Sequence, residues 1–540
     1  MARLLAVCGH AMHACAEWRM PCLRLWQQGA LRARWLCRVA VRHARDRRPL
    51  RALESPLPAP SSCLLRTQRG RPGTPYRLPT TTHMKRLPTL VEGLDEILNG
   101  GLFEGGVYIF EGPPGVGKTT LANQIAYTLA RREIRTLYVT MLAESHARML
   151  QHMEQQIFFD QQEVSAKVFY VSGYRELEQG GLKAVVDLLR GELLRHRASL
   201  LVIDGLVVGS LESMTNDSVR QFVHELQSLV SAMSCTCLLL TSGHGNALSA
   251  EQTMVDGIFA FEDHGFHWRA ERRLQVRKFR GSQVIRGQHT FCISTQGLQF
   301  FPRLESLPLT DAANARLGTT TLSTGSSALD GVLRGGGFFA GSATAVIGQT
   351  GTGKTTLALA FAAAGSAEAP GLVMSCTELA ADLRRLAGEA GLGVDAAVAA
   401  GALVIKNLGH EDESMDEMGH KLLRLVDELK IRRLVVDGVA GLADTLAFPE
   451  RGYRFLGRLL VELRRRGVTS MFTVDPDALA VAAGTELADG VTGWFDNVLS
   501  FDATPEARRH VDRRILDIAK VRGAGATQAS VDIYVARSGA

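Results

Sequence analysis

A phosphate-binding loop occurs twice in this sequence, and the repeat constrains the fold more than any other feature. The segment GPPGVGKTT ends at Thr120 and the segment GQTGTGKTT ends at Thr356, and both satisfy G-x-x-x-x-G-K-[ST] in full. An apolar run precedes each loop, Val107–Phe110 and Ala343–Ile347. After the first loop, apolar residues follow at helical spacing. Strand, loop and helix in this order are the context in which the motif binds phosphate.

The chemistry of the motif follows from its residue types. Glycines allow backbone N–H groups to turn inward around phosphate oxygens, and the N-terminus of the next helix adds partial positive charge. The lysine is expected to reach the β- and γ-phosphates of ATP, and the threonine hydroxyl after it to ligate Mg²⁺. The predicted nucleotide-binding residues are Gly112, Gly115, Gly117, Lys118, Thr119 and Thr120 in the first copy, and Gly348, Gly351, Gly353, Lys354, Thr355 and Thr356 in the second.

The repeat extends beyond the loop. Lys118 and Lys354 are 236 residues apart, and the upstream segments GLDEILNGGLFEGG and ALDGVLRGGGFFAG align with an offset of 235. The chain is therefore a tandem duplication, and 540 residues leave each copy room for a large core. We predict an α/β fold of two P-loop NTPase domains, each a mostly parallel sheet flanked by helices. The predicted boundaries are 84–300 and 318–540, with a linker over 301–317.

An acidic residue ends one apolar strand in each copy. A predicted amphipathic helix over Leu182–Arg195 is followed by the predicted strand Ala198–Gly205 (ASLLVIDG), which has Asp204 at its carboxyl end. In the second copy the segment LVVDG has Asp437 at the same place, at an offset of 233. A buried parallel strand that brings an acid to its carboxyl end is the Walker B pattern. The predicted metal-site residues are therefore Thr119, Asp204, Thr355 and Asp437.

A glutamate follows another strand in each copy. Glu144 comes just after the strand Thr136–Thr140, and Glu378 comes at the same place in the second copy, with an offset of 234. A carboxylate at this edge of the sheet can orient the water that attacks the γ-phosphate. A glutamate that only begins a helix is the alternative, and its occurrence in both copies favours the functional interpretation.

Two basic residues end each copy. Lys278 and Arg280 alternate on a predicted strand, so both are expected to face the same way, and Lys520 and Arg522 keep the K-x-R-G spacing at an offset of 242. A solvated basic strand face explains one such pair equally well. Because the pair lies far along the chain from the P-loop in both copies, it indicates cations presented to a phosphate, including that of a neighbouring subunit.

The first 83 residues differ in composition from the rest. They hold fifteen Arg, no Lys and three acids, a charge of about +12, whereas the whole chain carries +6, so the remainder carries about −6. A disordered leader, an Arg-rich transit peptide and a secretory signal are three interpretations. We favour a fourth, a start site placed too far upstream, because Met84 opens directly onto the recognisable domain.

The composition of the body excludes several functional classes. Its mildly acidic charge argues against constitutive nucleic-acid binding. No strongly apolar span is long enough for a membrane helix. The four cysteines after the leader form no C-x-x-C pair and are predicted to be reduced thiols. An ATP-dependent body is expected in the cytoplasm, where ATP is.

These motifs together resemble the KaiC family over about residues 86–536. The resemblance rests on T-x-x-x-G-L-D-x-x-L-x-x-G-G, the P-loop, the acid after the next strand, the Walker B strand and V-x-K-x-R-G, each present or nearly so in both halves. It implies two fused RecA-like ATPase domains and a homohexamer of two stacked rings, with ATP at the subunit interfaces. It also implies a set of catalytic residues, Glu144 and Glu378 in cis and Lys278, Arg280, Lys520 and Arg522 in trans.

The sequence departs from the clock proteins of that family. They carry two adjacent glutamates after the strand, whereas this chain has Ala143-Glu144 and Thr377-Glu378. Their phosphorylated Ser-Thr pair matches GVTGWFDN here, where only Thr492 is a hydroxyl residue, and their long C-terminal regulatory tail is missing. The chain is therefore identified as a KaiC-like ATPase rather than a clock oscillator.

The predicted function is a Mg²⁺-dependent ATPase that acts as a regulatory or signalling switch with a signalling-protein partner, because ATP at a subunit interface couples occupancy to ring geometry. A Ser/Thr protein kinase with autophosphorylation and a RecA/RadA-like DNA-dependent recombination ATPase are the alternatives. A nucleotide-gated scaffold without hydrolysis is a further one, and it predicts tight ATP binding with negligible turnover.

Overall fold

The computed structural model describes most of the chain after the basic leader. The described residues are 85–141, 146–205, 216–242, 254–266, 268–308, 317–407, 413–439, 441, 447–476, 493–501, 513–522 and 529–534. The interpretations of residues 1–83 lie outside this range, as do Glu144 and Thr492.

The first domain is built on a nine-stranded sheet in the order β11-β10-β9-β8-β3-β7-β6-β4-β5. Six strands from β8 to β5 pair in parallel and three extend the sheet antiparallel. The strands are β3 (Val107–Glu111), β4 (Thr136–Thr140), β5 (Val168–Ser172), β6 (Leu200–Asp204), β7 (Thr236–Thr241), β8 (Gly257–Phe266), β9 (Arg269–Phe279), β10 (Gln288–Ser294) and β11 (Gly297–Phe301). A separate short pair consists of β1 (Arg86–Leu87) and β2 (Leu102–Phe103).

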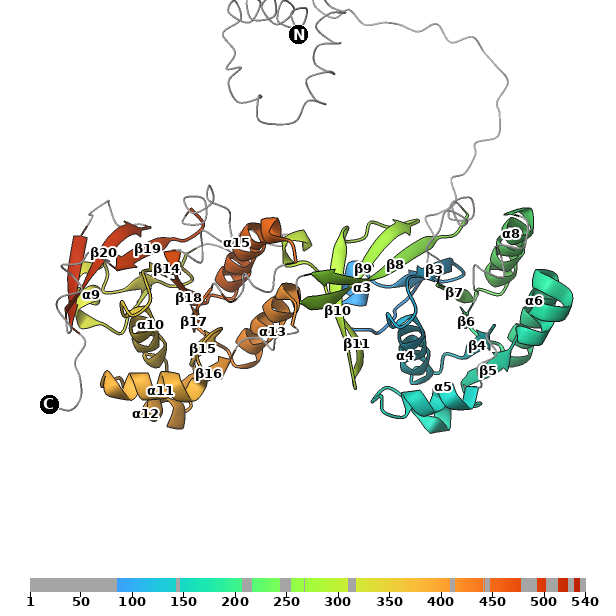
Figure 1. The fold of residues 1–540 in the computed structure, drawn as a ribbon, viewed down its shortest axis with the longest axis horizontal. Coiled ribbons are helices and arrows are strands. Elements are labelled where there is room, and N and C mark those ends of the chain that lie inside the picture. The colour runs from blue at the N-terminus through green and yellow to red at the C-terminus, as the bar shows by residue number, and fades with distance from the viewer. Residues whose placement is uncertain are drawn as a thin grey trace, which may run out of the picture. The chain divides into compact units, whose positions relative to one another are not determined.

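Helices cover both faces of this sheet, as Figure 1 shows. The helices are α3 (Leu94–Ile97), α4 (Lys118–Ala130) and α5 (His146–Met153) on one face, and α6 (Tyr174–His196) and α8 (Asn216–Ala232) on the other. Tyr108 and Phe110 of β3 pack on the α4 side, while Val107 and Ile109 pack on the α6 side. Burial on both faces explains why these strands are continuous apolar runs rather than alternating ones.

Helix α6 differs from its predicted extent. It begins at Tyr174, eight residues before the predicted start, but Gly181 inside it has φ 63° and ψ −164°. The regular amphipathic segment therefore begins at Leu182, as predicted, and an extra helical segment precedes it. Glycine tolerates this backbone conformation without the steric penalty of a Cβ.

The second domain repeats the arrangement with eight strands in the order β16-β15-β17-β18-β14-β19-β20-β21. The six strands from β16 to β19 pair in parallel, and the last two pairings are antiparallel. The strands are β14 (Ala343–Ile347), β15 (Gly371–Ser375), β16 (Leu403–Asn407), β17 (Arg433–Asp437), β18 (Thr469–Val474), β19 (Asn497–Phe501), β20 (Arg513–Val521) and β21 (Ala529–Tyr534). A short pair, β12 (Thr321–Leu322) and β13 (Phe338–Phe339), repeats that of the first domain. The prediction of two mostly parallel, helix-flanked sheets is confirmed.

Two helical layers also flank the second sheet. One face packs against α10 (Lys354–Ala363), α11 (Ala380–Glu389) and α12 (Val394–Ala399), together with the short α9 (Ser327–Val332). The other face packs against α13 (Met415–Glu428) and α15 (Pro449–Arg465). In both domains the P-loop strand lies inside the sheet. In the first domain β3 lies between β8 and β7, and in the second β14 lies between β19 and β18.

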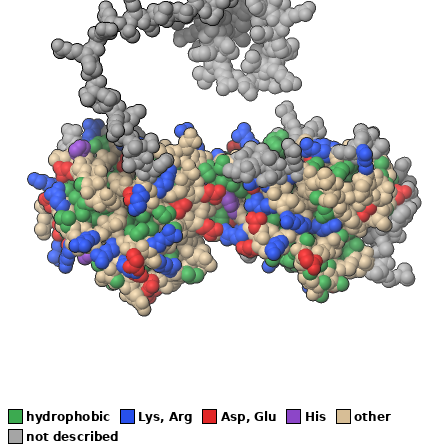
Figure 2. Space-filling view, turned by 180° about the vertical axis from the view of Figure 1, so that it is seen from behind, with side chains coloured by type: hydrophobic (Ala, Val, Ile, Leu, Met, Phe, Trp, Pro, Cys, Tyr) green, Lys and Arg blue, Asp and Glu red, His purple; other side chains and the backbone are tan. Residues whose placement is uncertain are grey.

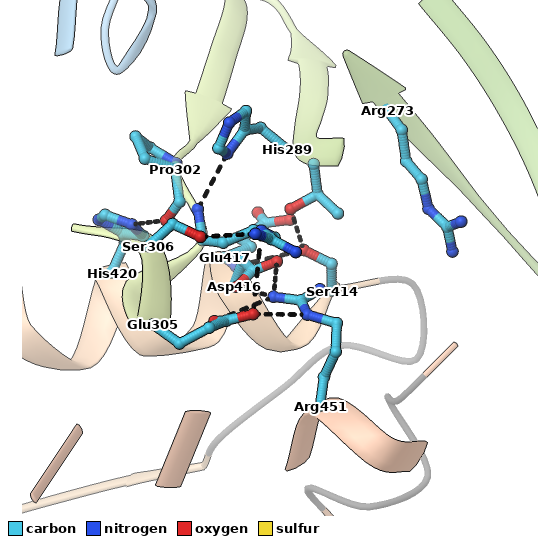
Figure 3. A network of polar contacts seen from close by, with 12 residues as sticks. Arg273, His289, Pro302, Glu305, Ser306, Ser414, Asp416, Glu417, His420 and Arg451 are labelled. Atoms are coloured by element: carbon cyan, nitrogen blue, oxygen red, sulfur yellow. Dashed lines mark hydrogen bonds and ion pairs between the residues drawn. The ribbon is translucent and has the colours of Figure 1, made fainter. Parts of the chain in front are cut away.

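The two sheets belong to one compact unit, and a polar network joins the linker turn to the second domain (Figure 3). Arg451 of α15 bonds Glu305 of the linker turn η5 (Leu304–Ser306) at 2.8 Å and Asp416 of α13 at 2.9 Å. His420 Nε2 lies 2.7 Å from the Pro302 carbonyl oxygen. The predicted linker thus contains an ordered turn that is bonded into the second domain.

The described surface carries both signs of charge. On the face shown in Figure 2, basic and acidic side chains are interspersed. Among the described residues, no helix is both long and apolar enough to cross a bilayer.

Candidate functional site

The first P-loop connects β3 to α4. Gly115 has φ 79° and Gly117 has φ 109°, and Gly117 caps the N-terminus of α4. The Lys118 Nζ donates hydrogen bonds to the carbonyl oxygens of Gly112 at 2.7 Å and Pro113 at 2.8 Å, so the lysine reaches back over its own loop. Burial lowers the pKa of Lys118, and the carboxylate of Asp204 partly offsets this effect.

The predicted metal ligands of the first site lie together. Thr119 is the second residue of α4 and Asp204 ends β6, and the Thr119 hydroxyl donates a hydrogen bond to Asp204 Oδ2 at 2.9 Å. Parallel strands bring their carboxyl ends to one edge of the sheet, which is why residues 85 positions apart meet here. A hydroxyl beside a carboxylate supplies the hard oxygen donors that Mg²⁺ prefers, so these residues fit the predicted metal.

The second site repeats this geometry. Gly351 (φ 81°) and Gly353 (φ 102°) shape the loop. The Lys354 Nζ donates to the carbonyl oxygen of Gly348 at 2.6 Å. The Thr355 hydroxyl lies 3.2 Å from Oδ1 of Asp437. Thr120 and Thr356 follow in the first turns of α4 and α10.

The acid of each site is held by a second hydroxyl that the sequence analysis missed. Tyr138 of β4 donates to Asp204 Oδ2 at 2.7 Å, and Thr473 of β18 donates to Asp437 Oδ1 at 2.6 Å. Tyr138 and Thr473 are buried, at 0% and 2% exposed. Since both are ordinary residues within apolar strands, no motif marks them. Only their register beside the Walker B strand reveals the contact.

Glu378 lies three residues past the end of β15, beside the acid of the second site. Burial raises the pKa of its carboxyl group, and the negative charges of Asp437 and Asp382 raise it further. Its backbone N–H is held by the Ser375 hydroxyl at 2.9 Å, which fixes the turn after the strand. A carboxyl group with a raised pKa at this edge is suited to exchange a proton with water.

Strand register places the end of each strand beside the acid of its site. Thr140 pairs with Asp204 in the first sheet, and Ser375 pairs with Asp437 in the second. Glu378 follows its strand end by three residues and Glu144 by four, so the two segments differ by one residue here. The role of Glu144 stays a prediction, because it lies outside the described residues.

The K-x-R-G pairs lie at the opposite edge of each sheet from the phosphate loops. Lys278 is the penultimate residue of β9, and Arg280 follows that strand. The Arg280 N–H bonds the Asp256 carbonyl oxygen at 2.7 Å, and Asp256 Oδ2 accepts from the N–H of Val107, the first residue of β3. The P-loop begins roughly 13 Å further along, at the far end of that strand.

The second domain places Lys520 and Arg522 in the same way. The Arg522 guanidinium bonds Asp496 Oδ1 at 2.8 Å, and Asp496 Oδ2 accepts from the N–H of Ala343, the first residue of β14. The Lys520 Nζ donates to the Phe495 carbonyl oxygen at 2.7 Å. Asp256 and Asp496 were missed by the sequence analysis, although their separation of 240 is close to that of the K-x-R-G motifs.

A bulge precedes each lysine of these pairs. Lys278 pairs with Ile258 and Val276 pairs with Phe259, so Arg277 is an extra residue in β9. The corresponding register shift in β20 occurs at Ala519. Bulges redirect side chains beside functional sites, and here the bulge comes before both residues of the pair, so the prediction that they face the same way stays a prediction.

Comparison with known proteins agrees with this geometry. The sequence model of the KaiC ATPase family matches residues 87–305 and again residues 322–540, which together exceed half of the chain. The chain belongs to the KaiC family. It is 25% identical to the circadian clock oscillator protein KaiC of Picosynechococcus sp. over 457 residues, which cover 82% of this chain and 86% of that protein. It is also 25% identical to the circadian clock oscillator protein KaiC 1 of Synechocystis sp. over 473 residues, covering 84% and 88%.

Membership of the KaiC family accounts for the duplicated architecture. Each family match spans one complete sheet with its P-loop and Walker B strand. Both KaiC ATPase domains are therefore present, and nucleotide binding is the shared property of the two sites.

Proposed function

We propose that this KaiC-family chain is a Mg²⁺-dependent ATPase with one hydrolytic site in each domain. The observation that carries the proposal is the contact between a P-loop threonine and a Walker B acid in both domains, at 2.9 Å for Thr119–Asp204 and 3.2 Å for Thr355–Asp437. Lys118 and Lys354 would hold the β- and γ-phosphates. Bound Mg²⁺ would supply charge neutralisation at the phosphate oxygens.

In the second site Glu378 would position the attacking water. Its raised pKa places the carboxyl group closer to neutral pH, where it can accept a proton from water and release it. Glu144 is the candidate for the same role in the first site. Because Glu144 follows its strand one residue later than Glu378 does, we expect the two domains to hydrolyse ATP at different rates.

The K-x-R pairs would act on the nucleotide of a neighbouring subunit. Lys278 and Arg280 lie at the amino end of β3, away from the P-loop of their own domain, and Lys520 and Arg522 are placed likewise. Arg280 also lines a depression of about 810 Å³ with Lys85, Glu104 and Asp256. Burial and the charge of Arg280 lower the pKa of Lys278. A homohexamer with ATP at its interfaces, as the family resemblance implies, would bring these cations to a phosphate.

The regulatory role follows from this assembly. If hydrolysis requires a residue from the next subunit, nucleotide state and ring geometry are coupled. A cytoplasmic signalling partner could then bind one conformation of the ring in preference to the other. The curated relatives are named as clock oscillator proteins. We propose a regulatory ATPase here rather than an oscillator, because Thr377 replaces the first glutamate of the pair and Gly490–Asn497 has no Ser-Thr pair.

The test uses full-length protein and ATP labelled at the γ-phosphate, with label followed in free phosphate and in protein. Wild type is compared with Lys118→Ala, Lys354→Ala and the double variant, with and without single-stranded DNA. We expect release of free phosphate that each single variant reduces and the double variant abolishes, without a response to DNA.

Other outcomes would select the alternatives. Label in the protein that disappears in Lys354→Ala would establish a kinase. Strong stimulation by DNA would move the chain to the recombination class. Tight ATP binding without any release of phosphate would leave a nucleotide-gated scaffold.

A further inference from the structure

The Walker B acids of the two domains are supported from opposite sides. Asp204 ends β6, whose neighbours are β4 and β7, and Asp437 ends β17, whose neighbours are β15 and β18. In the first domain the supporting hydroxyl comes from Tyr138 on β4. In the second it comes from Thr473 on β18, which corresponds to β7.

Strand register shows that each domain has only one of the two supports. Tyr138 pairs with Val202, two residues before Asp204. In the second domain the residue that pairs two positions before Asp437 is Val373, so Val373 is the counterpart of Tyr138. Conversely, Asp204 pairs with Leu240, and Leu240 is the counterpart of Thr473. Each domain therefore has one hydroxyl donor and one aliphatic residue at these two places, in opposite order.

In the first domain the support continues into a closed ring of hydrogen bonds. Asn123 of α4, which is fully buried, donates through Nδ2 to the Tyr138 hydroxyl at 3.3 Å and to the Thr119 carbonyl oxygen at 2.9 Å. Since the Thr119 hydroxyl donates to Asp204, and Tyr138 donates to the same oxygen of Asp204, the ring fixes both metal-site residues. Thr119 is held at its backbone and at its side chain.

One further tyrosine holds the ring from behind. The Tyr170 hydroxyl of β5 donates to Asn123 Oδ1 at 2.8 Å, which orients the amide. The Tyr127 hydroxyl lies 3.1 Å from that of Tyr170, outside the ring. The second domain replaces Asn123 and Tyr170 by Leu359 and Ile405, so no such ring can form there.

We propose that Tyr138 is the positioning residue of the first metal site, and that Thr473 is its counterpart in the second site. This inference rests on the proposed function, since it concerns the Mg²⁺ held with ATP. The Tyr138 hydroxyl orients Asp204 toward the metal, and Asn123 ties this orientation to the start of α4. Each site would thereby hold its own Mg²⁺ through an acid that a different residue orients, Tyr138 in the first site and Thr473 in the second.

A purely structural role makes a different prediction. A buried tyrosine hydroxyl needs a partner, and Asp204 would satisfy it without any effect on metal binding. Loss of the hydroxyl would then change stability alone. A positioning role requires that the gain in nucleotide affinity caused by Mg²⁺ depends on the hydroxyl, whereas affinity without metal does not.

The experiment isolates one site at a time in the full chain. In the Lys354→Ala background only the first site binds nucleotide, and in the Lys118→Ala background only the second. Affinity for the slowly hydrolysed analogue ATPγS is measured by calorimetry in Mg²⁺ and in EDTA. Binding of Mn²⁺ by the nucleotide complex, followed by electron paramagnetic resonance, gives a second readout that does not depend on turnover.

Tyr138→Phe removes only the hydroxyl. In the Lys354→Ala background it is expected to weaken Mn²⁺ binding and the Mg²⁺-dependent gain in ATPγS affinity by about tenfold, the usual effect of losing an outer partner of a metal ligand, and to leave the affinity in EDTA unchanged. Tyr127→Phe, a buried tyrosine at the far end of the same network, is the matched control and should change neither. Thr473→Val should reproduce the effect in the Lys118→Ala background, where Tyr138→Phe should have none.

Three results would overturn the proposal. These are an equal loss with and without metal in Tyr138→Phe, no loss in either condition, or the same loss in Tyr127→Phe. Failure of the proposed function would look different, because neither parent background would then bind ATPγS at all.

Discussion

At the scale of single residues, His289 shows how burial sets the charge state of one side chain. It is 0% exposed, and both ring nitrogens have partners that suit the neutral form. Nε2 lies 2.8 Å from the Ile285 carbonyl oxygen, and Nδ1 accepts from the backbone N–H of Arg303 at 3.1 Å (Figure 3). Burial disfavours the charged imidazolium, and so do the charges of Arg303 and Arg451, so the pKa of His289 is lowered to about 4.

This predicts a loss of stability in acid. Because the folded-state pKa lies below the unfolded value of about 6.5, neutral His289 contributes stability above that pH, and the contribution is lost as the pH falls toward 4. The loss amounts to about 3 kcal/mol at the acid end of the window. Urea unfolding at a series of pH values should therefore show a shallower decline in His289→Gln than in wild type.

The exposed His152 provides the control for this measurement. His152→Gln should keep the slope of the wild type between pH 6.5 and 4. An unchanged slope in His289→Gln would contradict the assignment of the acid sensitivity to the buried imidazole.

At the scale of elements, each P-loop strand is fixed at its amino end by one aspartate that also holds the arginine of the K-x-R-G strand. Asp496 is 1% exposed and bonds Ala343, Arg522 and Arg464. Asp256 makes the equivalent contacts to Val107 and Arg280 but is 31% exposed, and its carboxylate is 3.9 Å from the guanidinium. The corresponding aspartate is therefore buried in the second domain and partly exposed to solvent in the first.

The difference in burial predicts a difference in stability. Asp496→Ala removes a buried carboxylate that is the partner of the mostly buried Arg464 (16% exposed), and it is expected to lower the free energy of unfolding by about 3 kcal/mol. Asp256→Ala breaks a solvated pair and should lower it by about 1 kcal/mol. Parallel urea titrations of the two variants measure both values, and equal losses would refute the role given to burial.

At the scale of the whole molecule, the buried network in Figure 3 joins the linker turn to two helices of the second domain. Arg451 binds both Glu305 and Asp416, and Asp416 is 1% exposed. Burial raises the pKa of Asp416 to about 6, an effect that the charge of Arg451 opposes. Helix α13, which carries Asp416, also packs against β10 and β11 of the first domain.

Removal of the shared cation should therefore destabilise the molecule strongly. Arg451→Ala leaves two buried carboxyl groups without their common partner, and a loss of about 3–5 kcal/mol is expected. Arg454 lies on the same helix and is exposed, so Arg454→Ala is the matched control and should change little. Thermal unfolding of both variants measures the difference, and similar midpoints would show that the network does not contribute.

The sequence by itself determined the duplicated fold and the candidate phosphate-binding segment. Gly115, Gly117, Lys118 and Thr119 lie in one short segment, which is predictable because such loops surround a phosphate with backbone N–H groups of successive residues. Asp204 and Asp437 were predictable for a related reason, since an acid at the end of an apolar strand is a local pattern that recurs at a similar offset.

Only the tertiary structure decided which residues support these acids. Tyr138 and Thr473 are inconspicuous in the sequence, and their roles depend on which strands are neighbours and in what register. Such contacts join segments far apart along the chain, and their geometry is set by sheet pairing and side-chain packing, which no local pattern encodes.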